Sequence, residues 1–423
     1  MLMVGAKVTM LCSVLYKMGL DYVKVIEREM AAGMFAEGQG SLRHIDILPE
    51  YEDFLVQRFA PGGATQLVLD CGNGCFSTVA PRVLTRLGYR VDRLFCEPDG
   101  RFPNRPPNPA LAANIRALCQ RVVETGADLG LAYDGDGDRV AFVDALGQPA
   151  ESDRVAVLFV RALLGRGSNQ PSAISHQPER ASDVSHFTFD ASGPTLQAAG
   201  DTQHATRNTD HASRITPYPL PIAPYEVIYD IKSSSVLPEV VAQAGGHPVM
   251  ERSGHAFIKA TLLERQALFG AEISGHFFFR ELGGDDALFA SCLLLQILQA
   301  EGKSLAALLA EVPRYPITPD IRLRCSREQA EAILEEMARA FDDHPLSRLD
   351  GVRIDFGDGW ALARISVTEP LLTLRFEAHT QARLKEIQAL VRLRTPRLAA
   401  IWESALPRRL EAAEAVPLPV EAV

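Results

Sequence analysis

The sequence lacks the features of several large protein classes. It contains no uninterrupted apolar run of the ~20 residues that a membrane-spanning helix requires. It has no CxxC pair and no zinc-finger spacing, and its seven cysteines are scattered at Cys12, Cys71, Cys75, Cys96, Cys119, Cys292 and Cys325. It also lacks excess positive charge, because 53 acidic residues outnumber 43 basic ones and give a formal net charge of -10. We therefore expect a reduced, soluble, cytoplasmic protein with no nucleic-acid or membrane partner.

The first twenty residues are the only stretch that resembles a targeting signal. They read MLMVGAKVTMLCSVLYKMGL, and Lys7 and Lys17 interrupt the apolar character. No pattern of small residues typical of a cleavage site follows. We expect no signal peptide here.

Residues 62–144 alternate between strand and helix patterns. Residues 66–70 form an apolar run typical of a buried strand, the loop Gly72-Asn73-Gly74 follows, and a helix pattern ends near Gly88, where a left-handed cap is expected. After a strand at 89–95 and a proline-rich loop, Asn108 and Pro109 form a favourable N-cap and first-turn pair for a helix that ends near Gly126. A last strand at 128–133 completes a βαβαβ unit.

The later part of the chain indicates a polar insertion followed by two more units. Residues 167–224 are rich in Ser, His, Pro, Thr and Asp, which predicts a disordered insertion, and the irregular spacing of His176, His186, His204 and His211 favours a solvated linker over a metal-binding tract. A second α/β unit has a strand at 225–232, a helix after Pro238 and a helix at about 286–301. A final α+β unit opens after Pro313, with a capping box at Ser326 and Gln329. Three strands at 351–356, 360–367 and 371–378 and a helix from about Thr380 complete it.

The segment DGDGDR, at the carboxyl end of the third strand, predicts a metal site. Asp134, Asp136 and Asp138 are separated by glycines, and oxygen ligands without sulfur or imidazole suit Mg²⁺. An EF-hand would need glycine at Arg139 and glutamate at Ala145. An ordinary Asx-rich turn is the alternative, but three unneutralised carboxylates in register would repel one another.

Two further clusters are candidates for binding a phosphorylated ligand. Arg364, Ser366 and Thr368 alternate on one strand face and predict a phosphate clamp, although an exposed polar strand face would look the same. Glycine-flanked polar residues can reach sugar hydroxyls, and a histidine among them can exchange protons near neutral pH. Such residues occur at Glu272, Ser274 and His276, with Lys232 and His255 upstream.

Taken together and in this order, the motifs resemble those of the α-D-phosphohexomutase family, the phosphomannomutases and phosphoglucomutases. The resemblance runs from about residue 62 to residue 394, apart from the polar insertion, and rests on DGDGDR, DIKSS, SGHAFIK, GAEISGHFFF and RISVTEPLLTLRFEA. It implies repeated α/β domains around a cleft and a small C-terminal α+β domain. The implied divisions are a remnant of domain 1 at 1–60, domain 2 at 61–166, the insertion at 167–224, domain 3 at 225–312, domain 4 at 313–405 and a tail at 406–423.

The resemblance also implies a function, an Mg²⁺-dependent intramolecular transfer of phosphate between the 1- and 6-positions of a hexose phosphate in carbohydrate metabolism. A hexose 1,6-bisphosphate would be the intermediate and a possible activator. By this resemblance the metal ligands are Asp134, Asp136 and Asp138, the catalytic residues Arg139, His255 and His276, and the substrate-binding residues Lys232, Glu272, Ser274, Arg364, Ser366 and Thr368.

Departures from the family pattern leave a second function open. The family's phosphate-carrying serine would fall on Leu11, which cannot carry a phosphoryl group, and most of domain 1 ahead of it is missing. Asp21 also stands where a lysine is expected, and Ser13 or Cys12 would replace the serine only if this loop shifts by one or two residues. Milder departures are Arg105 for a common histidine and Val367 for an asparagine. The alternative to a mutase is therefore a protein that binds a phosphosugar without turning it over.

Overall fold

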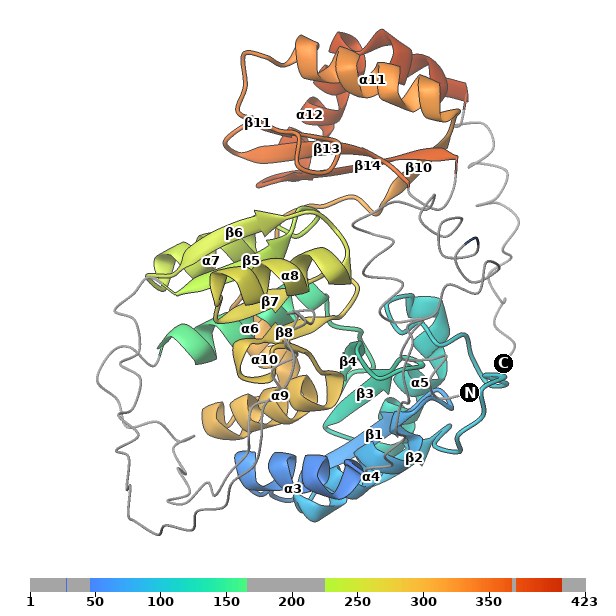
Figure 1. The fold of residues 1–423 in the computed structure, drawn as a ribbon, viewed down its shortest axis with the longest axis vertical. Helices are drawn as coiled ribbons and strands as arrows, with labels where there is room; N and C mark the ends of the chain where they lie inside the picture. The colour runs from blue at the N-terminus through green and yellow to red at the C-terminus, as the bar shows by residue number, and fades with distance from the viewer. Residues whose placement is uncertain (1–27, 29–45, 166–224, 367–369, 405–423) are drawn as a thin grey trace, which may run out of the picture.

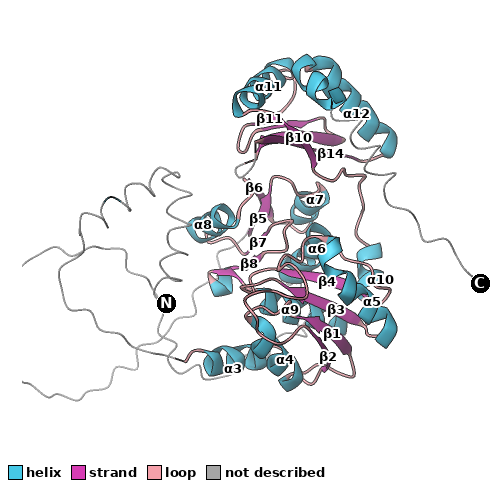
Figure 2. Cartoon of the chain, turned by 90° about the vertical axis from the view of Figure 1, so that its right-hand side faces the viewer, coloured by secondary structure: helices cyan, strands magenta, loops and turns pink. Residues whose placement is uncertain are grey.

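The computed structural model describes residues 28, 46–165, 225–366 and 370–404, which form three β-sheets with flanking helices (Figure 1). The first two sheets and the helices between them share one large apolar core, and the third sheet has a core of its own. In both views the third sheet lies at one end of the molecule, next to strands β5 and β6 of the second (Figures 1 and 2). The predicted insertion at 167–224 and the tail at 406–423 lie outside the described residues. Of the predicted domain 1 remnant at 1–60, residue 28 and residues 46–60 are described.

The first sheet has the strand order β2-β1-β3-β4, in which the first three strands are parallel and β4 is antiparallel. Every residue of β3 is buried, as expected for a strand with both faces covered. The elements are α3 (Leu48–Arg58), β1 (Gln66–Asp70), α4 (Phe76–Arg86), β2 (Arg90–Leu94), η1 (Ala112–Ile115), α5 (Arg116–Thr125), β3 (Leu129–Tyr133), β4 (Val140–Asp144) and α6 (Ser152–Leu164). The predicted order of strands and helices is confirmed, Gly88 has the expected positive φ of 86°, and Gly126, which ends α5, has a φ of 63°.

The predicted helix start at Asn108 is wrong. The Asn108 side chain accepts a hydrogen bond from the Ala110 amide at 3.2 Å, and its carbonyl accepts one from Asn114. This local Asx turn competes with helix capping. The chain therefore first becomes helical at Ala112, in η1.

The second sheet has the order β6-β5-β7-β8-β9. Its elements are β5 (Glu226–Asp230), α7 (Val236–Gln243), β6 (His247–Glu251), α8 (His255–Arg265), β7 (Phe269–Ala271), β8 (Phe277–Phe279), η3 (Arg280–Leu282), β9 (Gly284–Asp285), α9 (Ala287–Glu301) and α10 (Leu305–Ala310). The predicted helix after Pro238 instead begins at Val236. Proline is tolerated there because the first turn of a helix needs no intrahelical N–H donor.

The third sheet is antiparallel, with the order β10-β14-β13-β12-β11. Helices α11 and α12 lie together on its outer side, away from the rest of the molecule (Figures 1 and 2). Its elements are β10 (Ile321–Arg324), α11 (Arg327–Ala340), β11 (Leu346–Ser347), β12 (Val352–Asp355), β13 (Gly359–Ile365), β14 (Leu371–Ala378) and α12 (Gln381–Arg394). The predicted capping box of Ser326 and Gln329 is confirmed.

Two contacts bear on how the parts of the chain join. Helix α3 packs against α4 of the first sheet, and a small apolar cluster of Ile231, Trp360 and Leu362 joins the second sheet to the third. The domain boundaries themselves stay a prediction. No helix in the described ranges is both long enough and apolar enough to cross a bilayer.

Candidate active site

The three aspartates predicted to bind metal converge in the turn between β3 and β4. Asp134, Asp136 and Asp138 each offer one oxygen, and these oxygens lie within 4.8 Å of one another. Gly137, with φ 81°, allows the tight turn. Asp134 is fully buried and holds the turn together, because it accepts hydrogen bonds from the Gly137 amide at 2.8 Å and from Nε of Arg139 at 2.7 Å.

The electrostatics of this turn favour a bound cation. Burial, together with the neighbouring carboxylates, raises the pKa of Asp134 and of Asp136. A hard divalent cation prefers carboxylate oxygens and would offset their repulsion. The donor set therefore fits Mg²⁺, with Asp134, Asp136 and Asp138 as the residues that could hold it.

The loop 72–75 packs against residues 134–139, which we call the metal turn. The Cys75 amide donates a hydrogen bond to the Gly135 carbonyl at 3.0 Å. A Cβ added at Gly74 would lie 2.6 Å from the Asp134 carbonyl oxygen and 2.8 Å from that of Gly135. The loop after β1 therefore needs glycine at position 74 because the backbone of the metal turn passes so close.

Gly74→Ala is accordingly expected to displace the metal turn. Overpacking of this kind typically costs about 1–3 kcal/mol, and the free energy of unfolding measured with urea should fall by that amount. Gly100→Ala is the matched control, since a Cβ at Gly100 meets nothing within 4 Å. Equal stability of the two variants would contradict the close packing.

The predicted sugar-binding loop joins β7 to β8 and is bonded to the metal turn. The Val140 amide donates to the Gly275 carbonyl at 3.1 Å, and Arg139 and His276 form an isolated antiparallel bridge. The Ser274 hydroxyl lies 2.8 Å from Nδ1 of His276. The two loops, which are far apart in sequence, therefore form one site.

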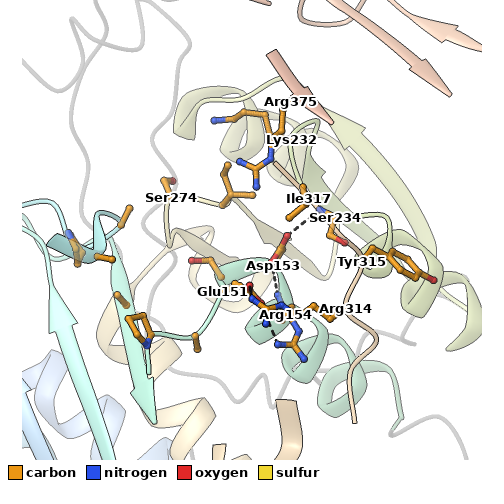
Figure 3. Close-up of a pocket in the computed structure, with 18 of the residues that line it drawn as sticks. Glu151, Asp153, Arg154, Lys232, Ser234, Ser274, Arg314, Tyr315, Ile317 and Arg375 are labelled. Atoms are coloured by element: carbon orange, nitrogen blue, oxygen red, sulfur yellow. Dashed lines mark hydrogen bonds and ion pairs between the residues drawn. The ribbon is translucent and has the colours of Figure 1, made fainter. Parts of the chain in front are cut away.

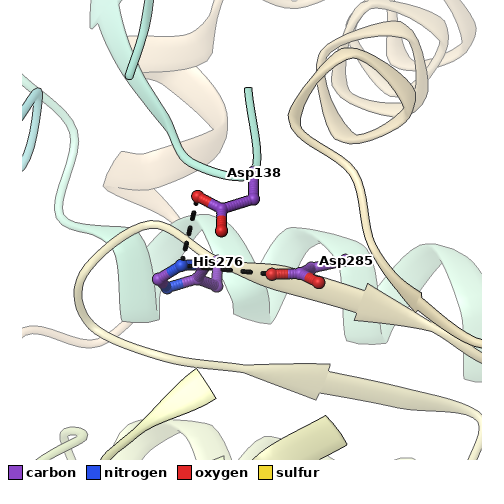
Figure 4. Close-up of side chains that lie close together, drawn as sticks. All are labelled: Asp138, His276 and Asp285. Atoms are coloured by element: carbon purple, nitrogen blue, oxygen red, sulfur yellow. Dashed lines mark ion pairs between the residues drawn. The ribbon is translucent and has the colours of Figure 1, made fainter. Parts of the chain in front are cut away.

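His276 lies among three carboxylates, of which Asp138 and Asp285 are drawn in Figure 4, and it links the two loops. Its Nδ1 lies 3.2 Å from Glu272, and its Nε2 lies 3.3 Å from Asp138 and 4.0 Å from Asp285. Burial disfavours the imidazolium, but its close pairing with the carboxylates of Asp138 and Glu272 outweighs this effect and raises the pKa of His276 to about 10. His276 is therefore a cation at neutral pH.

The other predicted residues of the second unit lie close by. His255 begins α8, its Nε2 is 3.0 Å from Asp285, and its ring centroid is 5.3 Å from that of His276. Lys232 follows β5, with its Nζ 3.9 Å from Asp230. The structure thus brings His255 and His276 together through Asp285, a residue that the sequence analysis missed because it lies on the short strand β9.

A cavity of about 450 Å³ adjoins the sugar loop, and both Lys232 and Ser274 line it (Figure 3). Arg154, Arg314 and Arg375 also line this cavity. The sequence analysis missed these three arginines, which come from α6, from the segment before β10 and from β14. Their separation along the chain left no local pattern that could have revealed them.

The predicted phosphate clamp is only partly described. Arg364, near the end of β13, pairs with Asp350 at 2.8 Å, and the Ser366 amide donates to the Leu371 carbonyl at 3.0 Å. Thr368 and Val367 lie outside the described residues, as does Leu11. Arg364 already has a carboxylate partner, so a phosphate at this position would compete with Asp350.

Comparisons with known proteins agree with this architecture. Sequence models for phosphoglucomutase/phosphomannomutase match at residues 49–147 (alpha/beta/alpha domain II), 219–315 (alpha/beta/alpha domain III) and 321–394 (C-terminal domain). A phosphomannomutase/phosphoglucomutase of Pseudomonas syringae is 32% identical over 87% of this chain and 68% of its own length. A phosphoglucomutase of Neisseria gonorrhoeae is 31% identical over 84% of this chain and 66% of its own length.

Solved structures give the same result. A phosphoglucomutase/phosphomannomutase family protein from Burkholderia thailandensis superposes with a TM-score of 0.69 and 29% identity, over 89% of this chain and 70% of the other. Given the three domain matches and relatives above 30% identity over most of the chain, this protein belongs to the phosphoglucomutase/phosphomannomutase family.

Proposed function

We propose that the chain is a cytoplasmic phosphohexomutase that interconverts the 1-phosphate and 6-phosphate of glucose or mannose with Mg²⁺. The observation that carries the proposal is the joining of an acidic metal turn to a sugar-binding loop. The Val140–Gly275 hydrogen bond and the His276–Asp138 ion pair connect them. Relatives named as phosphomannomutases and phosphoglucomutases support the same reaction.

Each side chain then has a defined task. Mg²⁺ on Asp134, Asp136 and Asp138 would neutralise charge on the transferring phosphoryl group. Glu272 and Ser274 would bind sugar hydroxyls. His276, a cation at neutral pH because its pKa is raised to about 10, would hold Asp138 and Glu272 in place through its two ring nitrogens and would not remove a proton.

The remaining predicted residues would surround the substrate. His255 is more exposed than His276, with 39% of its side chain accessible against 10%, and it is the better placed of the two to exchange a proton with a ligand. Arg139 and Lys232 would line the cleft, and Arg364, Ser366 and Thr368 would bind the phosphate that is not transferred.

The competing function is phosphosugar binding without turnover, and it follows from Leu11 at the position that matches the family's serine. The relatives quoted above carry the names of mutases, which favours turnover. The two functions differ in one measurable way, the appearance of the 6-phosphate.

The test uses the purified full chain with glucose 1-phosphate or mannose 1-phosphate and a catalytic amount of glucose 1,6-bisphosphate. We expect the 6-phosphate to form with Mg²⁺, to fall to background with EDTA, and to return when Mg²⁺ is restored. Calorimetric binding of the 1-phosphate without any product would establish the competing function. If the chain neither binds the 1-phosphate nor forms product, both proposed functions are wrong.

A further inference from the structure

Arg105, which stands where the family commonly has histidine, makes a buried bridge between β1 and the metal turn. Its side chain is only 4% exposed. Nε donates to both oxygens of Asp70, at 3.0 and 2.8 Å, and Nη2 donates to the Tyr133 carbonyl at 2.6 Å. Tyr133 is the residue immediately before Asp134, so the bridge ends where the metal turn begins.

The surrounding backbone is built to admit this guanidinium. Gly72 has φ 52°, and a Cβ there would lie 2.6 Å from Nη2 of Arg105. The Gly72 amide also donates to Asp70 at 2.8 Å. The loop after β1 therefore wraps around the Asp70–Arg105 pair and leaves no room for a side chain at position 72.

The proline-rich loop that carries Arg105 also contacts the metal turn directly. A Cβ added at Gly135 would lie 3.2 Å from the Phe102 ring and 3.3 Å from Pro107. On the same loop, the Asn104 side chain donates to that of Asn73 at 2.9 Å. The loop at 99–109 is thus fixed at several points. Through Arg105, the position of this loop determines where the Tyr133 carbonyl lies.

We propose that Arg105 is a positioning residue for the metal turn: it sets where Asp134 lies by fixing the carbonyl before it. The proposal rests on the function proposed above for the metal site. A guanidinium can serve Asp70 and the Tyr133 carbonyl at once because its donors diverge from a rigid plane, whereas a lysine ammonium is a single point donor on a flexible stem. A buried ion pair of this kind contributes little net stability, so positioning accounts for it better than stabilisation does.

The test measures Mg²⁺ affinity and loop protection in full-length variants. Partners behind metal ligands typically change affinity by about 10–100-fold, and we expect Arg105→Lys to raise the Mg²⁺ dissociation constant by that factor in calorimetric titrations. The double variant Asp70→Asn with Arg105→Gln removes both charges together and so leaves no lone buried charge. It replaces Arg105→Lys in the test if that variant does not fold. Arg121→Lys is the control, since its ion pair with Asp92 lies on the surface of the same domain.

Hydrogen exchange provides a second readout that does not depend on metal. In the metal-free chain, amides at 134–139 should exchange faster in both Arg105 variants, while those of α6 should not change. Wild-type Mg²⁺ affinity together with wild-type exchange at 134–139 would overturn the proposal. If the wild-type chain binds no Mg²⁺, the proposed metal site fails, and the exchange rates alone decide whether Arg105 positions the turn.

Discussion

Asp136→Ala is expected to lower kcat/KM for hexose-phosphate interconversion by roughly 10³-fold, the largest effect that we expect of any single substitution. Removal of one preorganised group that stabilises transition-state charge typically costs about 10²–10³-fold, and a lost metal ligand also weakens Mg²⁺ binding. Asp136 is exposed, and its neighbour Asp134 already holds the turn through Gly137 and Arg139. The loss should therefore come from the metal and leave the fold intact.

The same substitution should not lower the thermal stability of the metal-free chain. Although the Asp136 side chain is exposed, partial desolvation of its carboxylate and the charge of Asp134 raise its pKa, so the folded state disfavours the charged form. Asp136→Ala should leave the melting temperature in EDTA unchanged or higher, while Mg²⁺ no longer raises it. Glu124→Ala, an exposed acid on α5, is the control for net charge. If the variant keeps normal turnover and is still stabilised by Mg²⁺, Asp136 is not a metal ligand.

Local sequence patterns were sufficient to predict the parts of the site that lie within one turn. Asp134, Asp136 and Asp138 lie within five consecutive residues after β3, and Glu272, Ser274 and His276 lie in one hairpin turn, so their spacing alone indicated that each group would come together. The partners across the fold were not predictable. Asp285 lies beside His255 and His276, and Asp350 lies beside Arg364, only because separate helices, strands and turns pack together.

The sequence analysis erred where two local interactions compete for the same residues. Asn108 satisfies both an N-cap pattern and an Asx turn, and the structure has the turn. Arg105 was identified as a departure from the family pattern, but its bridge to Tyr133 spans 28 positions along the chain and depends on how three loops pack. Single-sequence patterns carry no information about such distances.

His276→Gln is expected to destabilise the metal-free chain by about 3 kcal/mol, because breaking a buried ion pair typically costs about 3–5 kcal/mol by leaving the partner charge uncompensated. Here the partners are Glu272 and Asp138, whose pKa values burial would raise but His276 holds low. Glutamine keeps the size and one donor and removes the charge. Urea unfolding in EDTA measures the loss, and His255→Gln, which alters the more exposed histidine beside Asp285, should cost less.

The pH dependence distinguishes lost charge from lost packing. The folded-state pKa of His276 is about 10, against an ordinary value of 6.5, so its protonation stabilises the fold fully below pH 6.5 and this contribution disappears as pH rises through 10. Wild-type protein should lose stability steadily between pH 7 and 10. His276→Gln lacks that slope, and the freed carboxylates Asp138 and Glu272, with their pKa values no longer held low, should make the variant relatively more stable as pH falls towards 5. Parallel pH profiles for the two proteins would mean that His276 stabilises the site by its shape and not by its charge.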